Sequence, residues 1–327
     1  MIRKTALVRI AALLGLLTLA EPACAQDASV RPSVQKSDEC VSATSSSWSS
    51  YEQQVWSKLC NGLAIEGKCD SASSLSTEFF ADIARLPYSN YLRERPVYIS
   101  HVPIGEKERE LFRSFYIDSM IGRDINIYLC PGVSSAEFSK INADGDVGIV
   151  NEEGGINVYR IKAKNVELIV RNDALMTNSD IEGSLGIYSV KPDREGMLQS
   201  LTVLGTTVGG DFTISGDDAT KSKVQRIVEI DGDKIKENVR IDHVNRLRAN
   251  RTRIGDVLTL DVDDNGDLDL SLSEIGTLEF DRDGSYVLFL EPRRSLKRKL
   301  ARWWPIEGFH ICVSQNKTAL TILCCTT

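Results

Sequence analysis

The chain has 327 residues, with 39 Lys and Arg against 46 Asp and Glu, so its formal net charge at pH 7 is −7. This acidic balance argues against nucleic acid as a partner, because nucleic-acid binding needs a basic surface. After residue 25, no segment has the roughly 20 consecutive apolar residues that a membrane-spanning helix requires.

Residues 1–25 have the features of a secretory signal peptide. Three basic residues within residues 1–9 precede an apolar run from Ile10 to Ala20, and Ala23-Cys24-Ala25 supplies small residues at the −3 and −1 positions of a cleavage site. We therefore expect a mature chain that begins at Gln26, carries a charge of −9, and lies in the periplasm or outside the cell.

Seven cysteines remain after removal of Cys24. Disulfides are expected in an oxidising compartment. Cys60 and Cys69 bracket a glycine-containing loop and are the predicted pair, whereas the other pairings stay open. His310 lies near three of the cysteines, but the spacing is not that of a zinc site. The seven are Cys40, Cys60, Cys69, Cys130, Cys312, Cys324 and Cys325.

The segment before the repeats predicts a tether followed by helices. Residues 26–47 are rich in Ser and lack apolar periodicity, and we assign residues 26–70 to a Ser-rich tether and disulfide-bearing segment. Trp48, Val55 and Leu59 recur at helical intervals before Cys60. A second helix is expected over about 73–86, where it ends before Pro87, and residues 71–96 form an N-terminal capping helix.

From Val97 to residue 290 the apolar residues come in pairs separated by one position, and the pattern repeats. Four copies share one spacing: an apolar residue, two free positions, Asp, Asn or Ser, and then the apolar pair. The first apolar residue of each pair falls at 125, 147, 166, 185, 212, 239, 258 and 278, and Val97 starts the series one step earlier. A period near 20 with short alternating strands predicts a β-solenoid.

This pattern resembles the right-handed parallel β-helices of exported bacterial proteins and, more loosely, bactofilin-type scaffolds. The resemblance implies an all-β fold, a right-handed parallel β-helix of about eight or nine coils with short helical caps at both ends. Two steps of 27 residues exceed the period and predict loops at Lys191–Gln199 and Asp217–Gln225, which are candidate ligand-binding segments.

One polar position recurs in the turn before each apolar pair. A row of such side chains on successive coils could bind cations or sugars. The structural interpretation, which we favour, is that they bond neighbouring backbone amides and one another. The residues are Asp124, Asp146, Asn165, Ser184, Asp211 and Asn238.

Some residues are similar to the motifs of polygalacturonase-like enzymes. Asn178-Ser179-Asp180, Asp217-Asp218, His243 and Arg253-Ile254 follow the order of those motifs, without glycines around the histidine or a lysine after Ile254. The resemblance implies catalytic roles for Asp180, Asp217, Asp218 and His243. Because Asp180 and Asp217 fall on different sides of a 20-residue coil, we do not expect them to converge on one sugar.

Residues 261–269 match the first nine positions of an EF-hand-type calcium loop. Position 12, which should be Glu, is Leu272, so we favour an acidic solvated turn over calcium. The ligands of the calcium alternative would be Asp261, Asp263, Asn265 and Asp267.

Residues 291–327 predict a basic capping helix followed by Cys-containing strands. Residues 293–304 form a basic amphipathic helix, which we expect to cover the last coil and which could also touch an anionic membrane. Phe309–Val313 and Ala319–Leu323 predict two strands. We expect an exported, non-catalytic scaffold or binding module for a cell-surface glycan or protein. The alternative is a polysaccharide-active hydrolase or lyase.

Overall fold

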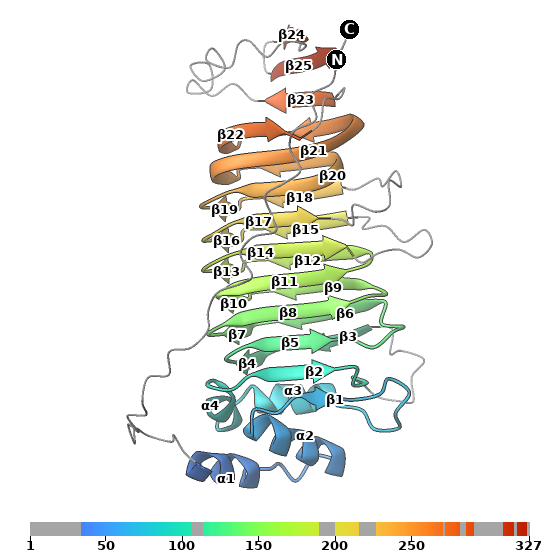
Figure 1. The fold of residues 1–327 in the computed structure, drawn as a ribbon, viewed down its shortest axis with the longest axis vertical. Helices are drawn as coiled ribbons and strands as arrows, with labels where there is room; N and C mark the ends of the chain where they lie inside the picture. Colours follow the sequence, from blue (N-terminus) through green and yellow to red (C-terminus); the bar gives the residue numbers. More distant parts are fainter. Residues whose placement is uncertain are drawn as a thin grey trace, which may run out of the picture.

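The computed structural model describes residues 34–105, 114–189, 200–215, 227–270, 272–281, 286–290, 310–316 and 319–325. In this part of the chain, short strands stack into a long column with helices at its N-terminal end (Figure 1). The signal peptide of residues 1–25, the loops within 190–199 and 216–226, and the basic helix of residues 293–304 are predictions that fall outside the described residues.

Each full coil of the column contributes three short strands, which stack in parallel on three faces. Face A contains β2 (Val97–Ser100), β5 (Ile125–Tyr128), β8 (Asp146–Asn151), β11 (Asn165–Val170), β14 (Leu185–Ser189) and β17 (Phe212–Ser215). Face B contains β3 (Ser114–Ile117), β6 (Ser135–Ser139), β9 (Gly155–Tyr159), β12 (Asp173–Thr177), β15 (Ser200–Leu204) and β18 (Ile227–Asp231). Face C contains β4 (Met120–Gly122), β7 (Ile141–Ala143), β10 (Lys162–Ala163), β13 (Asp180–Ile181), β16 (Thr207–Val208) and β19 (Lys234–Ile235).

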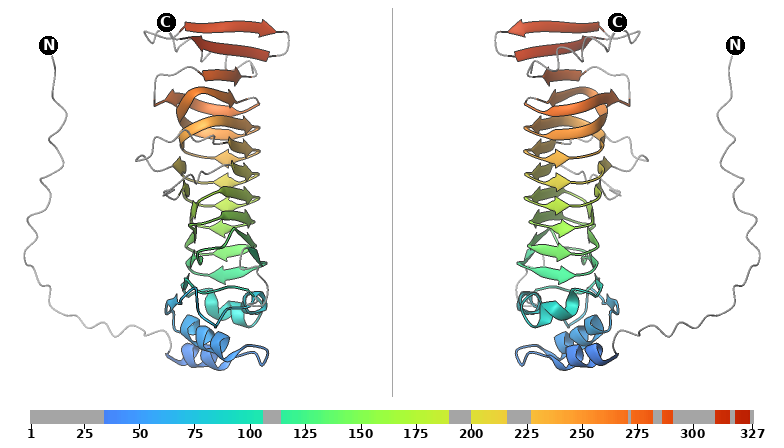
Figure 2. Two further views of the ribbon diagram at one scale, coloured as in Figure 1. Left: turned by 90° about the vertical axis from the view of Figure 1, so that its right-hand side faces the viewer. Right: turned by 90° about the vertical axis from the view of Figure 1, so that its left-hand side faces the viewer.

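The last coils use longer strands that run around the corners. β20 (Val239–Asn250) passes from face A to face B, and β21 (Arg253–Asp269) passes from face C through face A to face B. β22 (Glu274–Phe280) extends faces C and A, and β23 (Tyr286–Leu290) extends face B. The side views in Figure 2 show the strands of successive coils lying directly above one another.

The register of face A confirms the predicted repeat. Nine apolar residues form one column of Cα partners: Val97, Ile125, Val147, Val166, Leu185, Phe212, Val239, Leu258 and Leu278. These are the positions at which the sequence pattern placed the coils. Both 27-residue steps place their extra residues between faces A and B, after β14 and after β17, so the insertions share one corner of the column.

The core is a set of stacked aliphatic columns. On face A the second apolar residue of each pair points inward and is 0% exposed, from Ile99 in β2 to Leu260 in β21. Because strand side chains alternate between the two sides of a sheet, the residue between the two members of each pair faces outward. Full burial of one such side chain contributes about 1.5–3 kcal/mol. The inward columns therefore contribute most of the buried apolar area of this face.

Helices cover the first coil. They are α1 (Val34–Ser42), α2 (Ser50–Cys60), α3 (Thr77–Ile83) and α4 (Tyr88–Leu92). The helix predicted before Cys60 is confirmed. The second is shorter than predicted, because the Ser76 side chain accepts a hydrogen bond from the Phe79 N–H and begins the helix there. Pro87 does not end the helical region, since it is the N-cap residue of α4.

Buried aromatic side chains hold the cap together. The indole of Trp48 lies 5.5 Å from that of Trp56 and 5.1 Å from the ring of Phe79, between ring centroids. Glu52 is buried and accepts hydrogen bonds from the backbone N–H groups of Ser49 and Ser76. Burial alone would raise the pKa of Glu52, but the hydrogen bonds from Ser76 and Ser49 outweigh it and lower the pKa.

Two disulfides correct the predicted pairing. Cys40 is bonded to Cys60, and Cys69 is bonded to Cys130, so the predicted Cys60–Cys69 pair is wrong. The reason is that the chain after Cys60 does not turn back in a loop. It forms β1 (Ile65–Glu66), which pairs with β2 on the first coil and carries Cys69 toward the second coil.

The disulfide at Cys40 also corrects the tether. Residues 34–42 form α1 and are not an irregular linker. Cys40 is fully buried, and its carbonyl accepts a 2.7 Å hydrogen bond from the Trp56 indole. A Ser-rich segment with little apolar periodicity is therefore fixed by one covalent bond and one buried side chain.

Two strands at the C-terminal end depart from the parallel stack. The two strands predicted here are present as β24 (His310–Asn316) and β25 (Ala319–Cys325), which form an antiparallel pair, and β25 pairs antiparallel to β23. Their backbone ends the described column opposite the helices (Figure 1).

Candidate binding face

The recurring polar turn residues are occupied by a ladder of hydrogen bonds on face A. The Asn165 amide donates to Asp146 Oδ1 at 2.8 Å, and the Ser184 N–H donates to Asn165 Oδ1 at 2.9 Å. Two coils on, the Asn238 amide donates to Asp211 Oδ1 at 2.9 Å. The structural interpretation of this column is confirmed: these side chains fasten one coil to the next.

Of the four residues similar to hydrolase motifs, the described structure places the side chain of Asp180 and the backbone of His243. Asp180 lies exposed on face C. Its Cα partners on the next two coils are Thr207 and Lys234, and His243 follows in the coil that contains Lys234. His243 belongs to β20, between its face A and face B portions. Two coils span about 10 Å along the stack, and glycosidase carboxylates must flank one bond about 5–9.5 Å apart. Asp217 and Asp218 lie outside the described residues.

Residues 261–269 lie within β21, so the acidic solvated turn that the sequence favoured over a calcium loop is wrong. Asp261 is buried, whereas Asp267 lies 3.7 Å from the guanidinium of Arg246 on face B. The side chains of Asp263 and Asn265 are outside the described set. In the described part of the chain, no group of three His, Cys, Asp or Glu side chains could hold a metal ion. Calcium stays a prediction.

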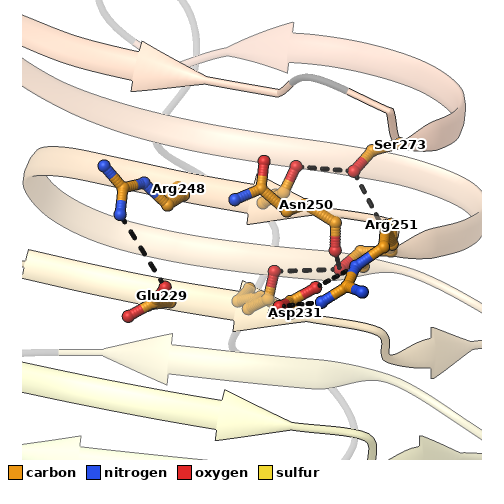
Figure 3. A network of polar contacts seen from close by, with 9 residues as sticks. Glu229, Asp231, Arg248, Asn250, Arg251 and Ser273 are labelled. Atoms are coloured by element: carbon orange, nitrogen blue, oxygen red, sulfur yellow. Dashed lines mark hydrogen bonds and ion pairs between the residues drawn. The ribbon is translucent and has the colours of Figure 1, made fainter.

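The most basic coil, residues 239–253, is neutralised by its neighbours. Arg248 lies 4.0 Å from Glu229 in the coil before, and Arg251 donates to Asp231 at 3.0 Å (Figure 3). Opposite charges on facing strands favour the observed register, while like charges there would oppose it. The ion pairs to the following coils are Arg240–Asp281, Arg246–Asp267 and Arg253–Glu274. The paired arginines therefore join neighbouring coils by ion pairs, and we do not assign them to an anion-binding site.

A different outward column of face A is apolar and aromatic. We call Tyr98, Tyr128, Val150, Ile169 and Tyr188 the tyrosine strip. The last four are Cα partners on successive coils. Tyr98 lies in the neighbouring column, with its ring centroid 5.7 Å from that of Tyr128. Coils are spaced by about 4.8 Å, so the strip from Tyr128 to Tyr188 extends about 14 Å along the column.

The strip begins at an exposed aromatic cluster. The Tyr128 side chain is 37% exposed, and the imidazole of His101 stacks on it with 6.5 Å between ring centroids. The backbone of His101 is left-handed, with φ of 53°, which turns the chain directly after β2. The Ser100 hydroxyl lies 2.7 Å from Nδ1 of His101 and fixes the ring orientation.

Two glycines in the column beside the strip leave space that neighbouring side chains occupy. A Cβ atom on Gly186 would lie 2.6 Å from Cε2 and 2.7 Å from the hydroxyl oxygen of Tyr188, so the phenol crosses directly over this glycine. A Cβ atom on Gly148 would lie 2.6 Å from Oδ1 of Asn126. At both glycines, the side chain of a neighbouring residue occupies the space that a Cβ atom would fill.

Glu167 stands between these two glycines in the same column. Its side chain is exposed. Burial is the main cause that raises the pKa of Tyr188, and the charge of Glu167 adds to it. The phenol hydroxyl therefore stays protonated and can donate a hydrogen bond. An aromatic surface with one carboxylate and one hydroxyl donor suits a ligand that has both apolar faces and polar edges.

The sequence analysis did not single out the tyrosine strip. All its residues except Tyr98 directly follow an apolar pair, so aligning the coils on that pair brings Tyr128, Val150, Ile169 and Tyr188 into one column. That alignment is the signal that could have found it.

None of the described helices has the length and apolar character needed to cross a membrane. Comparison of the chain with models of known protein families, with curated protein sequences and with solved structures found no match.

Proposed function

We propose that this protein is an exported, non-catalytic β-helix module that binds a glycan at the cell surface through the tyrosine strip. The observation that carries the proposal is the alignment of Tyr128, Val150, Ile169 and Tyr188 on successive coils. It creates a straight aromatic and aliphatic track on an otherwise polar face.

The chemistry of the track favours a sugar polymer. Sugar rings present C–H groups that pack against aromatic faces, and their hydroxyls need donors and acceptors at the edge of the contact. Here the Asn126 amide and the Glu167 carboxylate lie in the column next to the strip. A chain that runs along the column would meet Tyr128, Ile169 and Tyr188, whereas Val150 between them is only 8% exposed.

Export is supported by the N-terminal pattern and the disulfides. Two disulfides in the described residues fit an oxidising compartment. The periplasm and the cell exterior both meet this condition, and both expose the protein to cell-surface glycans.

We expect Tyr128→Ala and Tyr188→Ala each to weaken glycan binding about three- to tenfold, since a favourable aromatic contact contributes about 0.5–1.5 kcal/mol. Binding is measured by titration calorimetry with glycans selected from a panel. The matched control is Tyr116→Ala, because Tyr116 is 44% exposed but lies on face B.

The same panel tests the catalytic alternative. Reducing-end release should stay at the level of the protein-free control, because the proposed module is non-catalytic. Equal losses in the Tyr116 and Tyr128 variants, or glycan cleavage that disappears in Asp180→Asn, would contradict the proposal.

A further inference from the structure

Glu167 and the Tyr188 ring are neighbours on adjacent coils at one end of the strip. Glu167 and Gly186 are Cα partners on adjacent coils, and the Tyr188 phenol lies across Gly186. The effect of the Glu167 charge on the Tyr188 pKa reflects the same proximity. No side chain separates the two groups at Gly186, because a glycine occupies that position.

The described outward column beside the strip carries one acidic side chain. This column runs from Tyr98 in β2 through Glu167 in β11 to Thr213 in β17. Among its described residues, Glu167 is the one with a charged side chain. The polar turn column on the same face adds the acids Asp146 and Asp211. The first base in the Glu167 column is Arg240, three coils away, where it pairs with Asp242 and Asp281.

A carboxylate beside an aromatic face matches an ammonium group. The carboxylate forms an ion pair, and the ring attracts the same cation through its quadrupole. An anionic sugar such as a uronate would instead meet unfavourable charge along the face. We propose that the glycan carries free amino groups, and that Glu167 and Tyr188 hold the ammonium of an amino sugar. This proposal rests on the proposed function and adds the class of ligand.

A lysine-containing peptide offers the same ammonium but fits this face less well. Peptides that bind sheets gain affinity by adding a strand to a free edge. β8, β11 and β14 each have a parallel partner on both sides, so the middle of face A has no free edge. A glycan makes its contacts through ring faces and hydroxyls and needs no such edge.

The test compares a β-1,4-linked glucosamine hexamer with its fully N-acetylated form. Acetylation removes the positive charge and keeps the sugar rings. We expect wild type to bind the free-amine hexamer about tenfold more tightly, as an exposed ion pair and a cation–π contact together predict. Glu167→Gln should remove this preference by weakening the free-amine hexamer alone. Added salt should weaken the same complex through screening.

Glu137→Gln is the matched control, because Glu137 points outward at an equivalent position on face B. It should keep the wild-type preference. A wild type without preference for the free amine, or a Glu167→Gln variant that keeps it, would overturn the inference. The proposed function would still stand if Tyr128→Ala lost binding to the acetylated hexamer or to another glycan of the panel.

Two further outcomes are also decisive. If the tyrosine variants bind every glycan like wild type, both the inference and the proposed function fail. If an oligolysine peptide binds more tightly than the free-amine hexamer and depends equally on Glu167, the face is an ammonium site for proteins, and the glycan assignment is wrong.

Discussion

Ile214→Asp is expected to abolish the folded β-helix at neutral pH. Ile214 is 0% exposed and stacks between Ile187 and Ile241 of the adjacent coils. A carboxylate at this position would have neither water nor a basic partner. Burying an unpaired charge costs several kcal/mol, which is comparable to the 5–15 kcal/mol that typically stabilises a domain.

The control for this variant is the adjacent Thr213→Asp. Thr213 lies on the same strand but faces outward, with Arg240 as its Cα partner on the next coil. We expect Thr213→Asp to retain the wild-type circular dichroism spectrum and urea midpoint within about 0.5 kcal/mol, as surface changes usually do. If Ile214→Asp unfolds at the same urea concentration as Thr213→Asp, the inward stack is not the core described here.

The second large effect concerns Asp233, the acid inside the turn between faces B and C. The same inward position on neighbouring coils carries Ser179, Thr206, Thr252 and Ser273. Asp233 is 1% exposed, its Oδ1 accepts the Thr206 N–H, and its Oδ2 has no hydrogen-bond partner among the described residues. Burial raises the pKa of Asp233 to about 8, and the backbone hydrogen bonds from Thr206 and Asp231 lower it by less.

This raised pKa sets the direction of a pH effect on stability. An unfolded Asp loses its proton near pH 3.8, whereas the folded protein keeps the proton until about pH 8. Between these values the folded state binds more protons, so the free energy of unfolding falls as the pH rises. The slope from this residue reaches about 1.4 kcal/mol per pH unit, and the contribution is lost above the folded pKa.

Asp233→Thr should therefore stabilise the protein and should do so most at high pH. It completes the hydroxyl column and removes the buried acid, with an expected gain of about 2–5 kcal/mol at pH 9 and little gain at pH 4. Urea unfolding at pH 4, 7 and 9 measures the difference between variant and wild type. Asp233→Asn, which keeps the size of the side chain, should show the same trend. A difference that does not grow with pH would contradict a buried neutral acid.

The coil register could be predicted from the sequence because inward positions tolerate few residue types. Apolar pairs such as Ile125 with Ile127 recur once per coil, and the polar residue before them must bond the neighbouring backbone. The strands of faces B and C were not assigned individually, since their lengths vary and face C strands such as β10 have two residues. Short strands carry too few alternating positions for a periodic signal.

The disulfides and the candidate site depend on distances that cross many residues. Cys69 bonds a residue 61 positions away, which only the pairing of β1 and β2 explains. The site residue Glu167 is an ordinary surface acid in the sequence. Its role in the proposed site comes from the adjacent coil, where the Tyr188 ring lies across Gly186, the Cα partner of Glu167.

Hydroxyl-radical footprinting with the tightest-binding glycan of the panel tests the central claim most directly. It reads the solvent exposure of individual tyrosines in one protein, without any substitution. The glycan should protect Tyr98, Tyr128 and Tyr188 on face A, and it should leave Tyr116 on face B as reactive as in the free protein. Protection of Tyr116 with unchanged reactivity of Tyr128 and Tyr188 would place the ligand elsewhere and contradict the tyrosine strip as the binding face.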